Sequence, residues 1–285
     1  MTDQMIRCKE KVLDPKLHTL VMGILNVTPD SFSDGGRYLN PEIAIRRGIE
    51  MEQEGADIID IGAESSRPGA EPVSPEVEMD RLLPVIEGLV AAVKIPVSVD
   101  TYKAKVAEAA LLKGAHMVND ISGLHFDRDM KHVVAFHGVP VVLMHIKGTP
   151  RDMQQNPHYD DLFAEISRYL EESISMAVEA GIDENAIIID PGIGFGKRLE
   201  HNYQIIRHLD RFRTLGKPIL IGPSNKAFIG KVLNLEPDQR FEGTAAAVAI
   251  SIYNGADIVR VHDVLKIKRV CVIADTIMGK IGSEY

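Results

Sequence analysis

The stretch of sequence that decides the fold is DIIDIGAESSRPGAEPVSPEVEMDRLLPVIEGLVAAVKIPVSV, residues 57–99. It begins with an apolar run at 57–61, continues through a helix-period pattern at 76–93 and ends in a second apolar run at 95–99. Continuous apolar runs, rather than alternating apolar and polar residues, are typical of strands that are buried on both faces, as in parallel sheets. The stretch therefore predicts two parallel β-strands joined by a helix.

The same unit recurs along the chain. Short apolar runs, often rich in β-branched residues, lie at 20–24, 57–61, 95–99, 116–120, 139–144, 186–190, 218–222 and 257–261. The helix-period stretches that follow them lie at 41–55, 76–93, 103–113, 128–137, 160–180, 200–215, 241–254 and 264–280. Pro41 and Pro75 near helix starts, and glycines such as Gly138 at helix ends, support these limits. Strict alternation of strands and helices implies a doubly wound sheet or a closed barrel.

Three observations favour the barrel: there are eight strands, each has its own helix, and no GxGxxG motif follows the first strand. The 285 residues suit one such domain, because α/β barrels commonly use about 250 residues. We therefore predict an α/β fold, a single-domain (β/α)8 TIM barrel at 19–285, with residues 1–18 as an N-terminal extension that caps the barrel. The polar, irregular segment 145–159 is interpreted as a mobile loop.

Composition restricts the function. The formal net charge of −9 argues against a general nucleic-acid binder, which needs a net basic face. The two cysteines, Cys8 and Cys271, lack the spacing of a zinc site or a disulfide framework. The sequence contains no run of about 20 apolar residues and no apolar region near its N-terminus. We expect a cytoplasmic protein without membrane or nucleic-acid partners.

In this fold the active site is built from the carboxyl-terminal ends of the strands and the loops after them. The residues at those positions are Asn26, Ser65, Ser66, Arg67, Asp100, Asn119, Asp120, Met144, His145, Asp190, Ser224, Asn225, Lys226, Arg260 and His262. Turns favour Asn, Asp and Ser in any case, so a single polar residue there means little. Chance does not explain the cations after the last two strands.

Asp100, Asn119 and Asp190 form one candidate group. Carboxylates at a barrel mouth bind metals, act as bases or accept hydrogen bonds from the N–H edge of a heterocycle. An asparagine supplies both a donor and an acceptor, so the three residues could recognise a flat polar ring. Helix capping or a salt bridge within the barrel remains an alternative for the two carboxylates.

Arg67, Lys226, Arg260 and His262 form a second group, in which positive charge gathers despite the acidic composition. This pattern suits a phosphate or diphosphate, although solvated surface charges remain an alternative. Asn26 precedes a loop with oxygen donors that could hold a hydrated Mg²⁺ against such a ligand. These donors are Thr28, Asp30, Ser31, Ser33 and Asp34.

The sequence resembles the dihydropteroate synthase family from about residue 20 to the C-terminus. The motifs that carry the resemblance are MGILNVTPDSFSDGG at 22–36, DIGAESSRPGA at 60–70, SVDTYKAKVA at 98–107, NDISG at 119–123, DPGIGFGK at 190–197, SNKAFIG at 224–230 and RVHDV at 260–264. The first two are long and specific. Residues 19–285 would then be a pterin-binding domain.

The resemblance implies condensation of p-aminobenzoate with 6-hydroxymethyl-7,8-dihydropterin diphosphate, which releases diphosphate and forms a folate precursor. The matched pterin-binding positions are Asp100, Asn119, Asp190, Lys226, Arg260, Met144, Phe195 and Gly222. The matched diphosphate-binding positions are Asn26, Arg67, Arg260 and His262, with Mg²⁺ as the cofactor held by Asn26. The aminobenzoate positions are Ser66, Arg67, Pro68, Lys226 and Ala227, and the loops 27–38 and 64–72 correspond to loops that order around this substrate. We expect Arg67, Lys226, His262 and Asp34 to take part in catalysis.

The chain departs from the family pattern at a few positions. Ala63 and Ser66 stand where GGESTRPGA is usual, and Ser66 keeps the hydroxyl group. Asn225 stands where the family has arginine, which removes a cation near the aminobenzoate end, and Ala227 removes a hydroxyl group. The resemblance therefore supports the pterin half of the site more strongly than the aminobenzoate half.

Two rival functions remain open on the sequence. A pterin-dependent methyltransferase acting on methyltetrahydrofolate and a corrinoid would share the ring-binding residues but would not need the diphosphate loop. A catalytically silent pterin-binding protein is favoured only by Asn225. The apolar helix within 243–258 also predicts a surface covered by a second subunit, so we expect a homodimer through the last two helices.

Overall fold

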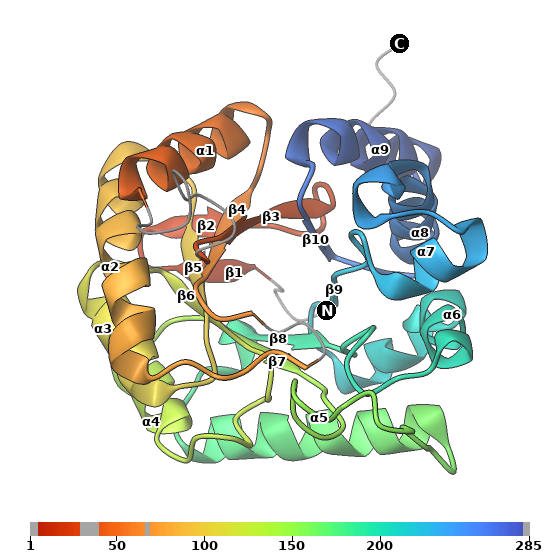
Figure 1. Ribbon diagram of the computed structural model, residues 1–285, viewed down its shortest axis with the longest axis horizontal. Helices are drawn as coiled ribbons and strands as arrows, with labels where there is room; N and C mark the ends of the chain where they lie inside the picture. Colours follow the sequence, from red (N-terminus) through yellow and green to blue (C-terminus); the bar gives the residue numbers. More distant parts are fainter. Residues whose placement is uncertain (1–4, 29–39, 66–68, 282–285) are drawn as a thin grey trace.

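The computed structural model describes residues 5–28, 40–65 and 69–281. Eight parallel strands are ringed by helices, as Figure 1 shows. The strands are β3 (Leu20–Asn26), β4 (Ile58–Gly62), β5 (Val97–Asp100), β6 (Met117–Asp120), β7 (Val141–Met144), β8 (Ile187–Asp190), β9 (Leu220–Ile221) and β10 (Ile258–Val261). Their order in the sheet is β8-β7-β6-β5-β4-β3-β10-β9. A parallel bridge between Ile189 and Ile219 joins the two edges. The predicted (β/α)8 barrel is confirmed.

The helices follow the predicted alternation, with two differences. They are α1 (Pro41–Gln53), α2 (Pro75–Ala92), α3 (Ala104–Leu112), α4 (Met130–His137), α5 (Leu162–Glu179), α6 (Leu199–Arg207), α7 (Ala227–Leu233), α8 (Phe241–Tyr253) and α9 (Val264–Ile277). The short helix α7 was not predicted, and the stretch at 200–215 divides into α6 and the 3-10 helix η2 (Leu209–Leu215). Two shorter 3-10 turns, η1 (Glu184–Ala186) and η3 (Pro237–Gln239), complete the list.

Helix starts follow the local chemistry of the sequence. The side chain of Asn40 accepts a hydrogen bond from Glu42 N at the start of α1, and that of Ser74 accepts from Val77 N at the start of α2. In both helices proline occupies the first turn, where its missing N–H has no partner to lose. These caps fix where each helix leaves the loop before it.

The amino-terminal end of the barrel is covered by a hairpin of β1 (Ile6–Cys8) and β2 (Lys11–Leu13). Ile6 and Cys8 are fully buried against the apolar residues of the barrel interior. Lys11 Nζ donates to Ile95 O at 2.9 Å, which anchors the hairpin to the chain just before β5. The hairpin therefore covers the apolar interior at this end of the barrel.

An apolar layer fills the barrel beneath the hairpin. Its members on the strands are Leu20, Met22, Ile58, Met117, Val142, Ile188, Leu220 and Ile258, and all are fully buried. Burying a side chain of this size contributes about 1.5–3 kcal/mol. The outward-facing residues of the strands pack against the helices in a second, larger core. This apolar floor supports a polar layer above it.

The segment 145–159 after β7 is irregular, as predicted, and several contacts hold it. Ile146 and Met153 are buried, and Tyr159 Oη donates to Gly196 O at 2.8 Å. Gly69 N donates to Pro150 O at 3.1 Å, so the segment also touches the loop after β4. Among the helices of the described chain, none is long and apolar enough to span a membrane.

Candidate active site

The interior of the barrel changes from apolar to charged toward the carboxyl-terminal ends of its strands. Residues two positions apart on a strand face the same side, so each floor residue is followed by another interior residue. On four strands the next interior residue is polar: Asp60 follows Ile58, Asn119 follows Met117, Asp190 follows Ile188 and Arg260 follows Ile258. Asp100 pairs with Asn119 in the register of β5 and β6. Strand geometry alone therefore gathers these groups in one layer.

Arg260 lies at the centre of this layer, between two carboxylates. Its Nε donates to Asp60 Oδ2 and its Nη2 to Asp100 Oδ2, each at 2.6 Å. Asn119 Nδ2 donates to the same Asp60 oxygen at 2.9 Å. Asp60 is fully buried, whereas the side chains of Asp100 and Arg260 keep 16% and 19% of their exposure. The pair Asp100 and Arg260 therefore faces the mouth, with Asp60 beneath it.

Burial changes the protonation of the carboxylates. It raises the pKa of Asp100 to about 7, against the opposing charge of Arg260. It raises the pKa of Asp190 to about 6, although Gly192 N donates to Asp190 Oδ1 at 2.7 Å. Burial alone would lower the pKa of Arg260, but Asp60 and Asp100 raise it above the usual value. Above pH 7 both groups are mostly ionised, and the layer then presents carboxylate acceptors beside a permanent cation.

Lys226 and an apolar wall form another side of the mouth. The Lys226 Nζ atom lies 4.1 Å from the centre of the Phe195 ring, within cation–π distance. Burial, aided by the charge of Arg260, lowers the pKa of Lys226 to about 8. Phe195 and Met144 are buried in a small apolar cluster that also contains Ile121, Ile146 and Met153. The wall offers an apolar surface, which includes the Phe195 ring, next to hydrogen-bonding groups.

Glycines allow the loop after β8 to lie close to the segment after β7. Gly192 has a φ of +68°, and a Cβ atom there would lie 1.9 Å from His145 O. At Gly196 a Cβ atom would lie 2.4 Å from Lys147 O. Only glycine fits such close backbone contacts, so GIGFG holds Asp190 and Phe195 in place. Gly222, after β9, borders the Cβ atom of Arg260, which a Cβ at this position would meet at 3.7 Å.

Two of the residues predicted to bind Mg²⁺ and diphosphate, Asn26 and His262, lie near the ends of β3 and β10. Asn26 ends β3 and is half-buried. The Ser224 hydroxyl group lies 2.9 Å from His262 Nδ1 and also accepts from His262 N at 3.3 Å. This contact orients the imidazole ring, and which of Ser224 Oγ and His262 Nδ1 donates depends on the tautomer of the ring.

Asn225 and Ala227 lie at the start of α7. Asn225 has a φ of +57°, a left-handed conformation that asparagine tolerates better than most residues. Arg240 Nη1 donates to Asn225 O at 2.9 Å, and Asn225 N donates to Thr244 Oγ1 at 3.2 Å. Ala227 is exposed. Thr244 Oγ1 also donates to Asn225 Oδ1, at a longer 3.5 Å, so the position that departs from the family pattern is held mainly by its backbone.

Four predicted site residues, Asp34, Ser66, Arg67 and Pro68, lie outside the described residues, as do most of 27–38 and the centre of 64–72. The described ends of the second loop are joined, because Val73 N donates to Glu64 Oε2 at 2.9 Å. Tyr102 Oη donates to Glu64 Oε1 at 2.6 Å, which connects the start of this loop to the residues that follow β5.

Sequence reasoning missed three features of the site. Asp60 lies inside an apolar run and was interpreted only as part of a buried strand, although a carboxylate there requires a partner. Lys197 is buried, with Nζ 2.9 Å from His145 Nδ1 and 3.0 Å from Phe195 O. Met153 packs into the wall from a segment without periodicity. Of these, only Asp60 had a signal in the sequence.

Comparisons with known proteins agree with this geometry. The model of a family described as pterin binding enzyme matches residues 22–262. The dihydropteroate synthase of Bacillus subtilis is 49% identical over 282 residues, which cover 99% of this chain and 96% of that protein. A structure of Xanthomonas albilineans dihydropteroate synthase with 4-aminobenzoic acid has a TM-score of 0.91 at 44% identity and covers 97% of this chain and 99% of its own. The same enzyme in complex with 7,8-dihydropteroate has a TM-score of 0.87 at 42% identity, with coverage of 96% and 98%.

Proposed function

We propose how this barrel mouth works from the premise that the chain belongs to the pterin binding enzyme family, in which its relatives are dihydropteroate synthases. The chain has the activity of those relatives: it joins p-aminobenzoate to a dihydropterin and forms dihydropteroate. The observation that carries the proposal is the layer of Asp100, Asn119 and Asp190 at the strand ends, bounded by Lys226 and Phe195. The methyltransferase and the silent pterin-binding protein are not favoured by these relatives.

The layer suits the polar edge of a pterin ring. Asp100 and Asp190 accept hydrogen bonds from the ring N–H groups, and Asn119 offers one donor and one acceptor. Phe195 and Met144 contact the ring, and the Arg260 guanidinium lies against it. Because these groups are held by strands, binding needs little reorganisation of the protein.

The diphosphate is placed between Asn26, Arg67, Arg260 and His262. Because Arg260 is already paired with two carboxylates, much of the positive charge that binds the diphosphate comes from Arg67, His262 and the metal. The residues present fit Mg²⁺: Asn26 supplies one neutral oxygen, and Mg²⁺ commonly keeps several waters and binds substrate phosphates. Among the described residues, no group of three His, Cys, Asp or Glu side chains could form a separate metal cage. When bound, Mg²⁺ would offset the negative charge that develops on the departing diphosphate.

The reaction needs no covalent intermediate with the protein. The C–O bond to the diphosphate breaks first, and its electron pair leaves with the diphosphate. The electron-poor methylene carbon of the pterin then forms a C–N bond with the amine of p-aminobenzoate, which afterwards loses a proton. The protein contributes by holding both reactants in position and by stabilising the departing charge through Arg67 and His262.

The aminobenzoate is placed beside the pterin methylene, near Lys226 and the first turn of α7. Ala227 N lies at the start of this helix, and Lys226 lies directly before it. Ser66, Arg67 and Pro68 complete the proposed site, with Asp34 contributed by the first loop. Arg67→Ala is expected to spare pterin binding and to reduce turnover.

Product formation tests the proposal. The purified protein would receive the dihydropterin diphosphate and Mg²⁺, with and without p-aminobenzoate, while diphosphate and dihydropteroate are measured. We expect dihydropteroate to form together with diphosphate. Pterin binding without any product linked to aminobenzoate would show that the acceptor is a different molecule.

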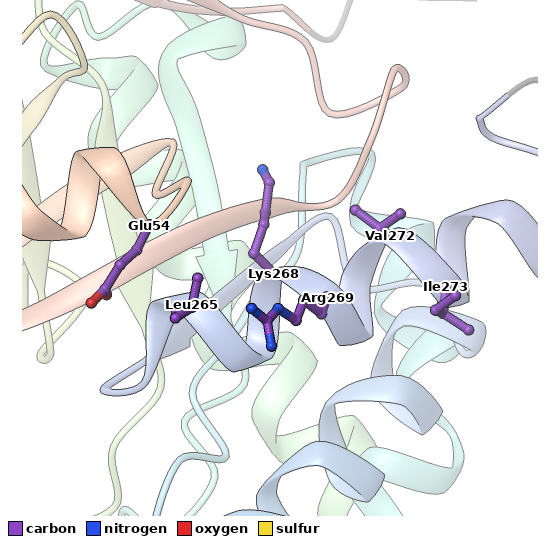
Figure 2. Close-up of a pocket in the computed structure, with 6 residues that line it drawn as sticks. All are labelled: Glu54, Leu265, Lys268, Arg269, Val272 and Ile273. Atoms are coloured by element: carbon purple, nitrogen blue, oxygen red, sulfur yellow. The ribbon is translucent and has the colours of Figure 1, made fainter.

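We also propose that two copies of the chain associate through α8 and α9. Apolar side chains are exposed on both helices: Ile250, Tyr253, Leu265, Val272, Ile273 and Ile277. Figure 2 shows a groove on this surface in which five labelled side chains come from α9 and Glu54 from the residue after α1. An exposed apolar face of this kind on a barrel's outer helices suits an identical partner. Cytoplasmic location and the lack of nucleic-acid or membrane partners stay predictions from composition.

Sedimentation tests the association. Ile273→Asp places a charge in the middle of the exposed face of α9, so the protein should sediment as a monomer at micromolar concentration. Phe136→Asp is the matched control, because Phe136 is an exposed apolar residue of α4, outside the proposed interface. A wild-type protein that is itself monomeric would contradict the proposal.

A further inference from the structure

We infer that Asp60 is a positioning residue for pterin recognition: it sets the plane of the Arg260 guanidinium and the orientation of the Asn119 amide without touching the substrate. The inference rests on the proposed pterin site. Asp60 is fully buried in β4, one layer above the apolar floor, and its Oδ2 atom accepts from both residues. Its contacts are therefore with the groups that face the mouth, and not with the mouth itself.

Asp60 decides which end of the Asn119 amide faces the ligand. A carboxylate held by a guanidinium only accepts hydrogen bonds, so the amide nitrogen of Asn119 must point toward Asp60. The contact is Nδ2 to Oδ2 at 2.9 Å. The carbonyl oxygen of Asn119 is thereby left to accept a hydrogen bond from another group. A neutral residue at position 60 could pair with either end and would not enforce this choice.

Asp60 also fixes the guanidinium of Arg260. Two bonds from one planar group, Nε to Asp60 and Nη2 to Asp100, define its orientation. If Asp60 lost its charge, Arg260 would be held by one strong ion pair only, and its plane could turn about the bond to Asp100. A ring that packs against this plane would then meet a less ordered surface.

The cost of burying Asp60 supports a role beyond packing. Its Oδ1 atom is buried without a hydrogen-bond partner in the described chain, and so is Ser98 Oγ, on the neighbouring strand. Asp60 and Ser98 are register partners in β4 and β5, so both polar groups point into the barrel. Buried polar atoms without partners are rare in proteins because each reduces stability. If position 60 served only the core, an apolar side chain would fill it with a smaller loss of stability.

Asp60 acts on Asp100 through charge as well. The charged groups whose fields act on Asp100 are Arg260, Asp60, Glu78 and Asp120, and Lys226 interacts with it as well. The negative charge of Asp60 raises the pKa of Asp100, next to the larger effect of burial. Removing that charge lowers the Asp100 pKa directly. The charge of Arg260, no longer shared with Asp60, then acts on Asp100 alone, which lowers the Asp100 pKa further.

The test compares Asp60→Asn with Asp257→Asn. Asp257 is a matched control on β10's amino-terminal side, because it is also buried and also accepts from an arginine, Arg213, and from Ile219 N. Binding of 6-hydroxymethylpterin would be titrated by calorimetry on both sides of the Asp100 pKa of about 7. For Asp60→Asn we expect affinity about 10- to 100-fold weaker at alkaline pH. We also expect the acid-side loss of binding to move to lower pH, whereas Asp257→Asn should keep the wild-type affinity and pH profile.

The possible outcomes separate a failure of the inference about Asp60 from a failure of the proposed pterin site. Wild-type protein that does not bind the pterin would refute the proposed site. A wild-type profile for Asp60→Asn, or a lower melting temperature with an unmoved pH profile, would mean that Asp60 serves only the core. If Asp60→Asn does not fold, nuclear magnetic resonance of the wild-type protein provides the second measurement. The Arg260 Nε–H, assigned with Arg260→Lys, should then exchange slowly with water, and fast exchange would overturn the inference.

Discussion

The two halves of the barrel mouth are built differently. The proposed pterin half, comprising Asp60, Asp100, Asn119, Asp190, Lys226 and Arg260, stands mainly on strands, and within it ion pairs of 2.6 Å join Arg260 to Asp60 and Asp100. In the described part of the proposed aminobenzoate half, Asn225 and Ala227 lie at the start of a seven-residue helix. There, backbone hydrogen bonds to Arg240 and Thr244 hold Asn225. One half is a buried network of side chains, and the other is a surface shaped by the backbone.

This difference predicts how each half responds to substitution. In a buried network, removing one partner leaves another charge without compensation, and such losses are large. On an exposed helix start, a side chain contributes little to the backbone contacts that hold the segment. The pterin half should therefore tolerate few changes, whereas the aminobenzoate half can depart from the family pattern, as Asn225 does. The predictions below test this contrast.

Asp190→Ala should have the largest effect. It removes a buried carboxylate whose negative charge acts on Lys226, Lys197 and Arg260, so the charge of three buried cations is less well compensated. We expect pterin affinity to fall by about 100-fold or more, measured by calorimetry with 6-hydroxymethylpterin. Asp183→Ala, an exposed cap before β8, is the control and should bind normally. Binding within a few-fold of wild type would show that the pterin half is not an interdependent network.

Chelation of the metal should separate the pterin from the diphosphate. With EDTA, or in Asn26→Ala, we expect turnover to fall by about 10- to 100-fold, because the charge of the departing diphosphate is no longer offset. Binding of 6-hydroxymethylpterin, which has no diphosphate, should not change. Excess Mg²⁺ should restore turnover in the chelated sample, measured as diphosphate release. If chelation also abolished pterin binding, the proposed position of the metal beside the diphosphate would be wrong.

The protonation of Lys226 should limit activity on the alkaline side. Burial lowers its pKa to about 8, so the amine is charged below this pH and neutral above it. If the charge is needed, kcat/KM falls about tenfold for each pH unit above that value. Lys226→Arg keeps the charge and should remove this alkaline fall, whatever its absolute rate. Lys217→Arg, at the opposite end of the barrel, is the control and should retain the alkaline fall in kcat/KM. If Lys226→Arg also retained this fall, it would have to arise from the titration of another group.

Most of the fold could be predicted because barrel strands are buried on both faces. All eight strands lie where continuous apolar runs predicted them, within about two residues. The elements that were missed are short: β1 and β2 have three residues each, and α7 has seven. Periodicity needs more residues than these to become visible. Their positions depend on tertiary contacts, such as the burial of Ile6 and Cys8 against the barrel floor.

The site was predictable only where topology decides it. The ends of parallel strands meet at one face, so Asp100, Asn119, Asp190 and Arg260 could be placed together without knowing their contacts. The partners within the layer could not be deduced, because Asp60 and Arg260 are separated by 200 positions in the sequence. The contact of Lys197 with His145 and that of Arg240 with Asn225 likewise arise from loop packing, which has no periodic signal.

Asn225→Arg should have the smallest effect on binding, and this effect should be limited to the aminobenzoate half of the mouth. An arginine restores the cation that the family carries near the aminobenzoate, and a partly exposed charge contributes about 0.2–1 kcal/mol. We therefore expect the KM for p-aminobenzoate to fall by about two- to fivefold, with pterin affinity unchanged. The left-handed backbone at a φ of +57° disfavours arginine, so the melting temperature should fall by a few degrees. Asn234→Arg has the same backbone cost at a φ of +53° and should lower stability without changing this KM. If Asn225→Arg altered pterin affinity as much as the KM for p-aminobenzoate, the two halves would be coupled, because the buried network would then respond to a charge at the helix start.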